Sequence, residues 1–588
     1  MTRNPFSSSL FEAQPAGSGR RPEGGRSYVA GSTTSPLRYM TIPQLLDRAC
    51  ERHGAAMAAR FDASDTTLTW YDLRARADEV AAGLLALGVR RGDRVGIWAP
   101  NRLEWLLVQF GTARIGAVLV NINPAYRQGE LDYALNAVGC KVLVMARALK
   151  SSDYLAMMRA LAPEIDRPYA GREVLGAVRL PALEQVIVLG DGPLPARAIP
   201  FSRFTRLAGP AHRVRLGALA AALEPDDPIN IQFTSGTTGS PKGATLSHLN
   251  IVNNARFCAQ AMRLTEEDRL CLPVPLYHCF GMVLGVLAAA TRGCGLVFPG
   301  EAFDAGQTLA SITRHRCTAL HGVPTMFSAV LEHETFAQAD LRALRTGIMA
   351  GAPCPIETMN RVMREMHMDE ITIAYGMTET SPVSFQSDLD DAVDLRVSTV
   401  GRIQPHCEAK IIGADGRIVP VGEKGELCTR GYLVMRGYWN DPERTDEATD
   451  AAGWMHTGDL ASLDENGYCR IVGRVKDMLI RGGENVYPAE IEEHLHRHPD
   501  VAQAQVFGIP HERLGEEVCA WVVLRAGADT TPQALQAFCR EQIAHFKVPR
   551  EIRIVEAFPM TATGKPRKVE MRERMMAELG LADTGGAR

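Results

Sequence analysis

The stretch of the chain best suited to chemistry is a loop of glycine and hydroxyl residues that ends in a lysine. It reads Thr234-Ser235-Gly236-Thr237-Thr238-Gly239-Ser240-Pro241-Lys242-Gly243 and follows the stretch Asn230-Ile231-Gln232-Phe233. Glycines let the backbone fold back so that amide and hydroxyl donors converge, and Lys242 adds a positive charge. Ten residues of this composition directly after a strand-like stretch predict a binding loop for a polyphosphate.

Spacing separates this loop from the Walker loop of kinases and motor ATPases. The Walker pattern places Ser or Thr directly after a Gly-Lys pair. Here Lys242 lies three residues past Gly239, and Gly243 follows it. The spacing therefore disfavours a kinase or a motor ATPase.

The loop resembles the phosphate loop of the adenylate-forming (AMP-binding) superfamily, which contains acyl-CoA synthetases, luciferases and peptide-synthetase adenylation domains. The resemblance covers residues from about Thr41 to Ala577. The remaining motifs occur in the order typical of that superfamily, and they are Gly351-Ala352-Pro353, Tyr375-Gly376-Met377-Thr378-Glu379, Thr457-Gly458-Asp459, Gly473-Arg474-Val475-Lys476-Asp477, Gly482-Gly483-Glu484-Asn485 and Thr561-Ala562-Thr563-Gly564-Lys565.

The resemblance implies a nucleotide site built from the earlier motifs. The loop Gly351-Ala352-Pro353 would lie along the adenine edge, where small residues let the backbone approach the base. Tyr375, followed by Gly376, would stack on the adenine face, Thr378 would reach the phosphates and Glu379 would hold Mg²⁺. The chemistry agrees, because a flat ring suits a purine and a hard cation prefers carboxylate oxygen.

The later motifs imply a mobile small domain. Asp459 would accept hydrogen bonds from both ribose hydroxyls, and Arg474 would reach the ribose or a phosphate. Lys476 stands at the hinge position, and Gly482-Gly483 would approach the pantetheine arm of coenzyme A after the domain has turned. Lys565 would bridge the attacking carboxylate and the α-phosphate, where in-line attack builds negative charge. The implied catalytic set is Lys565, Thr378, Glu379 and Lys242.

The acid is expected to bind beside Tyr277-His278-Cys279-Phe280-Gly281, which resembles the segment at the mouth of the acyl and pantetheine tunnels. We expect His278 to orient the carboxylate rather than to transfer protons. The other expected pocket residues are apolar and do not reveal a chain length, and they are Met282, Val283, Val323, Met326, Phe327 and Met349. Residues 150–154, 161–164 and 183–187 resemble the medium-chain acyl-CoA ligase branch.

The resemblance implies a two-step ligase. A carboxylic acid, with a medium-chain fatty acid as the expected substrate, would react with MgATP to give an acyl-adenylate and pyrophosphate, and coenzyme A would then displace AMP. Two other enzyme classes stay open, an aryl-acid CoA ligase and an adenylating enzyme that loads a separate carrier protein. A non-catalytic nucleotide sensor is disfavoured because binding alone would not require both Lys565 and Glu379.

The elements that would position these residues alternate between strand and helix. Strand-like stretches occur at residues 94–99, 117–121, 186–189, 228–233 and 371–374, and a capping-box-like start at Asn101 predicts a helix that ends near Ile115. Such alternation is typical of α/β proteins, in which ligands bind beyond the carboxyl ends of parallel strands. The loops after residues 233 and 374 carry motif residues, so we expect the site there.

The expected architecture is a large N-terminal domain of several subdomains, with parallel sheets and helices, and a small mobile α+β C-terminal domain. Residues 1–40 are expected to form a disordered tail, 41–475 the large domain, 476–477 the hinge, 478–577 the small domain and 578–588 a second tail. Within the small domain we expect helices from Pro488 and Pro532 and strands at 501–507 and 517–524.

Composition limits the partners and the cellular compartment that we expect. The 588 residues carry a net charge of −4 and show no long basic block, which disfavours nucleic acid as a partner. Thirteen scattered cysteines without a CxxC pair favour a reducing compartment, and the longest apolar run is too short to span a membrane, so we expect a soluble, cytoplasmic protein. The four arginines near the N-terminus are a feature that organelle transit peptides share. However, Glu12, Glu23 and the glycines argue against the amphipathic helix that such a peptide forms.

Overall fold

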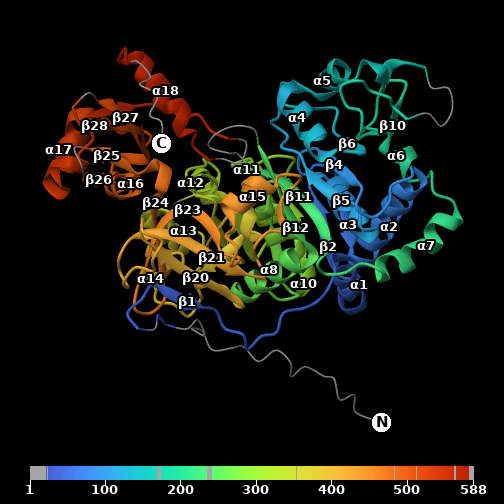
Figure 1. Cartoon of the computed structure of the whole chain (residues 1–588), viewed down its shortest axis with the longest axis horizontal. Coiled ribbons are helices and arrows are strands. Elements are labelled where there is room, and N and C mark those ends of the chain that lie inside the picture. The colour runs from blue at the N-terminus through green and yellow to red at the C-terminus, as the bar shows by residue number, and fades with distance from the viewer. Residues whose placement is uncertain are drawn as a thin grey trace, which may run out of the picture.

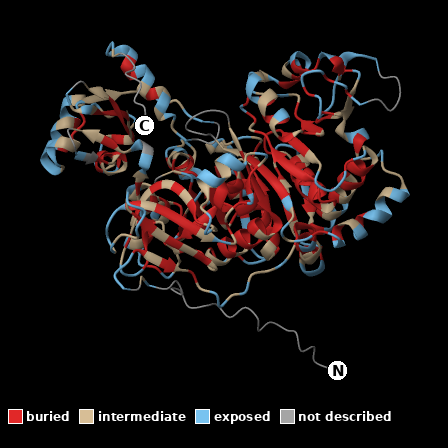
Figure 2. Cartoon of the chain, viewed as in Figure 1, coloured by how far each residue is buried: buried red, intermediate tan, exposed pale blue. Residues whose placement is uncertain are grey.

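The computed structural model describes residues 21–22, 24–168, 174–234, 241–352, 354–481, 484–511, 513–561 and 565–581. Figure 1 shows a large body whose segments run from blue to orange along the chain, and a smaller orange-red to red body beside it. Buried residues concentrate in the sheets of the large body (Figure 2). The expected α/β class with a large and a small domain is confirmed.

The first sheet of the large domain contains the two strands that flank the predicted phosphate loop. In spatial order its described strands are β10 (Ala198–Pro200), β9 (Gln185–Val188), β6 (Val142–Met145), β4 (Arg94–Trp98), β5 (Val118–Asn121), β11 (Pro228–Thr234), β12 (Lys242–Ser247) and β22 (Gly437–Tyr438). All neighbours from β10 to β11 are parallel, and β12 and β22 add antiparallel pairs. Strands buried on both faces read as continuous apolar runs, which is why β4, β5 and β9 were predictable.

A second sheet carries the tyrosine motif at its edge. Its described strands, in order, are β19 (Arg402–Ile403), β18 (Val383–Gln386), β17 (Glu370–Gly376), β16 (Thr346–Ala350), β15 (Ala319–Gly322), β13 (Arg269–Cys271), β14 (Gly295–Phe298), β2 (Met57–Phe61) and β3 (Thr66–Thr69). Strands β17, β16 and β15 run parallel, so the loops after them share one edge of the sheet. That edge therefore brings together residues that are distant in the sequence.

Helices cover both sheets. Those of the large domain are α1 (Ile42–His53), α2 (Trp70–Ala86), α3 (Leu103–Arg114), α4 (Gln128–Val138), α5 (Tyr154–Leu161), α6 (Phe201–Phe204), α7 (Pro210–Ala221), α8 (His248–Ala261), α9 (Cys279–Gly281), α10 (Ala288–Arg292), α11 (Ala305–His315), α12 (Pro324–Leu331), α13 (Ile356–Glu365), α14 (Val393–Ser398) and α15 (Pro442–Ala448). A short hairpin, β7 (Ala148–Leu149) with β8 (Ser152–Asp153), precedes α5. The largest fully buried side chains include Trp70, Trp98 and Trp105, which anchor this helix-on-sheet core.

The predicted capping box at Asn101 is wrong. Helix α3 begins after Arg102, whose side chain makes no capping hydrogen bond. The Asn101 side chain instead donates to the Val274 carbonyl oxygen (3.0 Å) and accepts from the Leu276 amide (2.8 Å). Asn101 is buried, and these bonds to a distant loop satisfy both ends of its amide group.

A third sheet corrects the predicted N-terminal tail. Its described strands are β1 (Tyr28–Ala30), β20 (Cys407–Ile412), β21 (Gly425–Gly431), β23 (Met455–Leu463) and β24 (Cys469–Arg474), and all are antiparallel. Strand β1 lies within the predicted disordered segment 1–40. It is held by ladder bonds to β20 and by the Ser27 hydroxyl, which donates to the Pro420 carbonyl (2.9 Å). Backbone pairing needs no apolar composition, so composition alone could not reveal this strand.

The small domain surrounds a sheet of its own. Its described strands are β25 (Leu479–Arg481), β26 (Glu484–Val486), β27 (Val501–His511), β28 (Gly515–Leu524) and β29 (Glu551–Ile554), and its helices are α16 (Pro488–His496), α17 (Pro532–Gln542) and α18 (Lys568–Glu578). The predicted helices from Pro488 and Pro532 and the two long strands are confirmed. The chain passes between the domains from β24 to β25 through a short 3₁₀ turn, Val475–Asp477.

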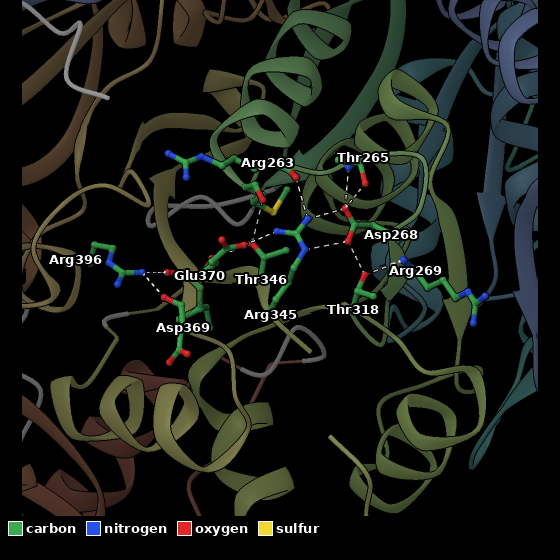
Figure 3. A network of polar contacts seen from close by, with 12 residues as sticks. Arg263, Thr265, Asp268, Arg269, Thr318, Arg345, Thr346, Asp369, Glu370 and Arg396 are labelled. Atoms are coloured by element: carbon green, nitrogen blue, oxygen red, sulfur yellow. Dashed lines mark hydrogen bonds and ion pairs between the residues drawn. The ribbon is translucent and has the colours of Figure 1, made fainter. Parts of the chain in front are cut away.

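A buried charge network ties together the strands of the second sheet at the edge opposite its motif loops (Figure 3). Asp268 is 4% exposed, and both its carboxylate oxygens accept hydrogen bonds from Arg345 (3.2 and 2.7 Å). The Thr318 hydroxyl and the Thr265 amide add two more bonds to Asp268, each of 2.7 Å. Burial alone would raise the pKa of Asp268, but these hydrogen bonds outweigh it and hold the pKa below its ordinary value.

We predict that Arg345→Met destabilises the large domain, because it leaves the Asp268 carboxylate buried without its cation. Arg345 is itself about one-third exposed, so the expected loss is about 2 kcal/mol, below the usual range for breaking a buried pair. Urea unfolding at pH 7 measures this loss. Because the folded-state pKa of Asp268 is depressed, the pair stabilises the folded protein at neutral pH. This stabilisation is lost as the pH falls through the folded-state pKa. The difference between variant and parent should therefore shrink on acidification.

Arg342→Met provides the matched control. Arg342 pairs with Asp340 two residues away, and both side chains are largely exposed. This substitution should leave the urea midpoint unchanged. Equal effects of the two substitutions would contradict a structural role for the buried network.

Candidate active site

Glu379 lies where the first two sheets meet. It belongs to the 3₁₀ turn Thr378–Thr380 that follows β17, and only 4% of it is exposed. Its Oε1 atom accepts hydrogen bonds from the Thr234 hydroxyl at the end of β11 (3.0 Å) and from the Tyr438 hydroxyl (2.9 Å). The structure thus brings two predicted residues, Thr234 and Glu379, into direct contact although 145 positions separate them.

Tyr438 is a site residue that the sequence analysis missed. Besides bonding Glu379, its ring lies 4.9 Å from the Lys242 ammonium. Burial, followed by the neighbouring Glu379 carboxylate, raises the pKa of Tyr438 above its ordinary value, so its hydroxyl stays protonated and donates. Tyr438 therefore fixes both a predicted carboxylate and a predicted cation.

Several predicted residues fall outside the described part of the chain. They are Ser235, Gly236, Thr237, Thr238, Gly239, Pro353, Gly482 and Gly483. The backbone of Lys476 is described within the turn between the domains, but its side chain is not. The flanking residues Thr234 and Lys242 fix both ends of the phosphate loop, and they are ladder partners in β11 and β12.

Asp459 connects the tyrosine motif to the strand that leads into the small domain. The Tyr375 hydroxyl donates to its Oδ2 atom (2.5 Å), and Arg474 Nε lies 3.2 Å from its Oδ1 atom. Asp459 and Arg474 face each other across β23 and β24. Burial raises the pKa of Asp459, while Arg474 and the Tyr375 hydroxyl oppose that shift. These contacts unite three of the predicted residues.

Two predicted glycines are required by their surroundings. Gly351 has φ +91°, and a Cβ atom built on it would lie 3.2 Å from Val323 Cγ1. A Cβ atom on Gly376 would lie 1.7 Å from the Pro382 carbonyl oxygen. Gly376 has no room for a Cβ atom beside the backbone, and the positive φ of Gly351 favours glycine there. Ala352, next to Gly351, is half-buried.

Lys565 of the small domain lies against this part of the large domain. Its Cε atom is 3.8 Å from a Cβ built on Gly351. Lys565 as a whole residue is exposed, but desolvation of its ammonium and then the positive charge of Arg474 lower its pKa, while the carboxylates of Asp459 and Glu379 raise it. The Lys565 loop closes on itself, because its amide donates to the Thr561 hydroxyl (2.9 Å) and its carbonyl accepts from the Thr561 amide (2.7 Å). The ammonium therefore feels the charges of both predicted carboxylates.

His278 stands at the start of α9 and is neutral. Its Nδ1 atom accepts a hydrogen bond from the Phe280 amide (3.1 Å), which leaves the ring proton on Nε2. Burial, with a smaller effect from Lys565, lowers the pKa of His278 to about 3. A ring that stays neutral at pH 7 can donate a hydrogen bond from Nε2, which suits an orienting role better than proton transfer.

The predicted pocket residues divide into two groups. Met282 begins a π-helical turn, Met282–Leu287, and its sulfur lies 3.2 Å from Asn121 Nδ2 and 3.1 Å from Gln232 Nε2. Val323, beside Gly351, and Met326 are both buried at the start of α12. The polar residues Asn121 and Gln232 were missed by sequence reasoning. They lie on adjacent parallel strands, where their burial resembles that of the apolar core.

Polar contacts hold the small domain against the large one. The Lys424 ammonium, directly before β21, lies 2.7 Å from Glu490 Oε1 and 4.2 Å from the centre of the Tyr487 ring. On the α12 side, Arg525 of the small domain approaches Glu332 to 3.8 Å. All four ionic side chains are 32–50% exposed. The docked arrangement therefore rests on weak, hydrated pairs.

Comparison with known proteins supports the architecture over nearly the whole chain. The family model for AMP-binding enzymes matches residues 46–439, and the model for the C-terminal domain of AMP-binding enzymes matches residues 490–565. The chain belongs to the AMP-binding enzyme family. The predicted family resemblance is therefore confirmed.

Two relatives and one solved structure locate the chain within this family. It is 45% identical over 558 residues to the mitochondrial medium-chain acyl-CoA ligase ACSF2 of Danio rerio, with 94% of this chain and 91% of that protein covered. The Bos taurus protein of the same name is 43% identical, with 95% and 91% covered. The crystal structure of the anthranilate CoA ligase AuaEII with anthranoyl-AMP superposes with a TM-score of 0.82 at 26% identity, covering 93% of this chain and 99% of that one.

All thirteen cysteines are free thiols. Among the described residues, no helix combines the length and apolar character needed to cross a membrane.

We predict that Tyr375→Phe raises the pKa of Asp459, because it removes a hydrogen bond that favours the carboxylate over the carboxylic acid. A protonated Asp459 accepts fewer hydrogen bonds. As the pH is lowered, AMP affinity should therefore begin to fall at a higher pH in the variant than in the parent protein. Calorimetric titration with AMP between pH 5 and pH 8, at about half-unit steps, measures this shift.

Tyr468→Phe is the control for that experiment. The Tyr468 hydroxyl also bonds a buried aspartate, Asp391, but this pair lies away from the predicted nucleotide residues. Its removal should leave the pH profile of AMP binding unchanged. An identical shift in both variants would contradict the assignment to Asp459.

Proposed function

We propose that this AMP-binding enzyme joins a medium-chain fatty acid to coenzyme A through an acyl-adenylate, with release of pyrophosphate and AMP. The relatives named medium-chain acyl-CoA ligase, which match 94–95% of the chain, support the substrate class. The observation that carries the reaction type is the position of Lys565. A cation from the small domain lies beside Gly351 within the field of Glu379 and Asp459, where the nucleotide site of the large domain is expected.

In the proposed first step, this arrangement binds ATP and aligns the acid. The Tyr375 ring offers a flat face for adenine while its hydroxyl holds Asp459 for the ribose, together with Arg474. Thr378 and the phosphate loop contact the phosphates, with Lys242 at the loop's end. Lys565 then neutralises charge that develops as the carboxylate attacks the α-phosphate. His278, neutral and donating from Nε2, orients the acid.

The donor set at Glu379 fits Mg²⁺. The buried carboxylate lies 3.0 Å from the Thr234 hydroxyl oxygen, and hard divalent cations prefer such oxygen ligands. When bound, Mg²⁺ would neutralise phosphate charge during in-line displacement. Tyr438 holds Glu379 in place by donating to Oε1, so the carboxylate is positioned before any substrate arrives.

In the proposed second step, the small domain turns about Lys476. Rotation withdraws Lys565, breaks the Lys424–Glu490 and Glu332–Arg525 pairs, and presents the Gly482-Gly483 segment to the pantetheine thiol. Each exposed pair is worth about 0.2–1 kcal/mol, so their loss does not prevent the motion. The thiol then attacks the acyl-adenylate and AMP leaves.

An aryl-acid CoA ligase is the second candidate. The solved structure with the TM-score of 0.82 is an anthranilate CoA ligase, and its overall arrangement covers 93% of this chain. The buried Gln232 and Asn121 beside Met282 add polar groups near the expected acyl pocket. The relatives with 43–45% identity carry more weight, because they match the sequence more closely over the same length.

The deciding experiment measures pyrophosphate release from MgATP with straight-chain acids of increasing length and with benzoate, each with and without coenzyme A. We expect release to peak at a middle chain length and to yield AMP and a thioester when coenzyme A is present. A maximum with benzoate would replace the fatty acid by an aryl acid. Absence of release with every acid would overturn the ligase.

We predict that Lys565→Ala abolishes adenylation while thioester formation from supplied acyl-adenylate survives. The ammonium is needed at the α-phosphate only in the first step, and loss of even one preorganised donor that stabilises developing negative charge typically costs about 10²–10³ in rate. Pyrophosphate release and thioester formation are measured separately. Arg574→Ala, which removes an exposed cation of α18 paired with Glu570, is the control and should keep both rates. Equal loss of both steps in Lys565→Ala would refute this division of roles.

A further inference from the structure

Outside the proposed active site, β21 and β23 gather three side chains with metal-binding atoms. Glu426 and Cys428 are two residues apart on β21, so their side chains point to the same face of the sheet. His456 on β23 is the direct ladder partner of Cys428. One oxygen, one sulfur and one nitrogen from these residues all lie within 4.8 Å of one another.

The distances between these atoms suit a tetrahedral ion. His456 Nδ1 lies 3.1 Å from Glu426 Oε2 and 3.6 Å from Cys428 Sγ. Zinc bonds of roughly 2.0–2.1 Å to N and O and 2.3 Å to S, at tetrahedral angles, separate N from O by about 3.3 Å and N from S by about 3.6 Å. The N–O and N–S separations are therefore within about 0.2 Å of the tetrahedral values, and the oxygen and the sulfur lie within 4.8 Å of each other.

Neighbouring groups already orient these side chains. The Gly458 amide donates to Glu426 Oε1 (3.2 Å), which leaves Oε2 for the cluster. On the far side of the imidazole, Asp450 Oδ2 lies 4.0 Å from His456 Nε2. The other oxygen of Asp450 is held by the Ala452 and Trp454 amides, each at 2.9 Å. A carboxylate behind a metal-binding histidine is the usual way in which its ring and tautomer are fixed.

Exposure gives an ion a route to the cluster. Cys428 is buried, but the Glu426 and His456 side chains are 27% and 32% exposed. One sulfur, one imidazole and one carboxylate form a borderline-soft donor set, which suits Zn²⁺ and excludes Mg²⁺ or Ca²⁺, since these cations take oxygen ligands. A thiolate, a carboxylate and a neutral imidazole would also cancel the charge of one divalent ion.

We propose that Glu426, Cys428 and His456 bind one Zn²⁺ ion, with water in the fourth position. Binding releases the thiol proton of Cys428 to solvent. The ion would join β21 to β23 one residue before the Thr457-Gly458-Asp459 motif. Since Gly458 already bonds Glu426, the ion would also stiffen the loop that carries Asp459.

Cobalt substitution tests this site on the full-length protein. After removal of metals with EDTA, one equivalent of Co²⁺ should produce a thiolate-to-cobalt absorption band and the strong visible bands of four-coordinate Co²⁺, and Zn²⁺ should abolish both. Cys428→Ser should lose the thiolate band, and Glu426→Gln, which keeps the side-chain shape, should bind Zn²⁺ at least tenfold more weakly. Thermal denaturation with and without Zn²⁺ should show stabilisation of the parent protein and none of Cys428→Ser.

Cys469→Ser is the matched control. Cys469 is a buried thiol on β24 of the same sheet and lies outside the cluster, so this variant should bind Co²⁺ like the parent protein. The proposal is overturned if the parent protein takes up no Co²⁺ at micromolar concentration. It is equally overturned if Cys428→Ser and Glu426→Gln retain the parent spectrum and affinity, because the three side chains would then form only a hydrogen-bonded cluster.

Discussion

A buried carboxylate must be paired, and the organisation of this protein depends on how Asp459 and Glu379 meet that requirement. Asp459 is held by Tyr375 from the second sheet and by Arg474 from the strand that leaves for the small domain. Glu379 is held by Thr234 from the first sheet and by Tyr438. Desolvated charges without such partners would cost several kcal/mol each. The two carboxylates therefore fix the relative position of three sheets at one point.

The small domain is attached to this rigid point by much weaker forces. Its contacts with the large domain include the half-exposed pairs Lys424–Glu490 and Glu332–Arg525, whose charges water can solvate when they part. Its own core is separate, since the buried residues of β27 and β28 pack with α16 and α17. A domain with its own core and a hydrated interface can move as a unit.

The sequence predicted the elements whose burial is simple and missed those held by polar contacts. Strands β4, β5 and β9 are apolar runs, and the motif loops follow β11 and β17 as expected. Tyr438 escaped notice because it lies in a two-residue strand and bonds Glu379 over 59 positions. Strand β1 escaped because it has only three residues and lies in a segment rich in Ser, Gly, Pro and Arg, and Asn101 was misread because its side chain bonds a distant loop instead of its own helix. Each feature that was missed is held by hydrogen bonds between residues far apart in the sequence. Such bonds leave no periodic pattern in the sequence.

The electrostatics of Lys565 connect these observations to the proposed two-step reaction. In the docked arrangement, desolvation of its ammonium and the nearby Arg474 both disfavour its positive charge, and Asp459 and Glu379 only partly oppose them. The phosphates of ATP would add negative charge beside Lys565 and so strengthen docking. Once pyrophosphate leaves, the acyl-adenylate retains a single phosphate and that attraction falls. Since the interface pairs contribute little, the loss of pyrophosphate would itself favour release of the small domain, which is the order of events that thioester formation requires.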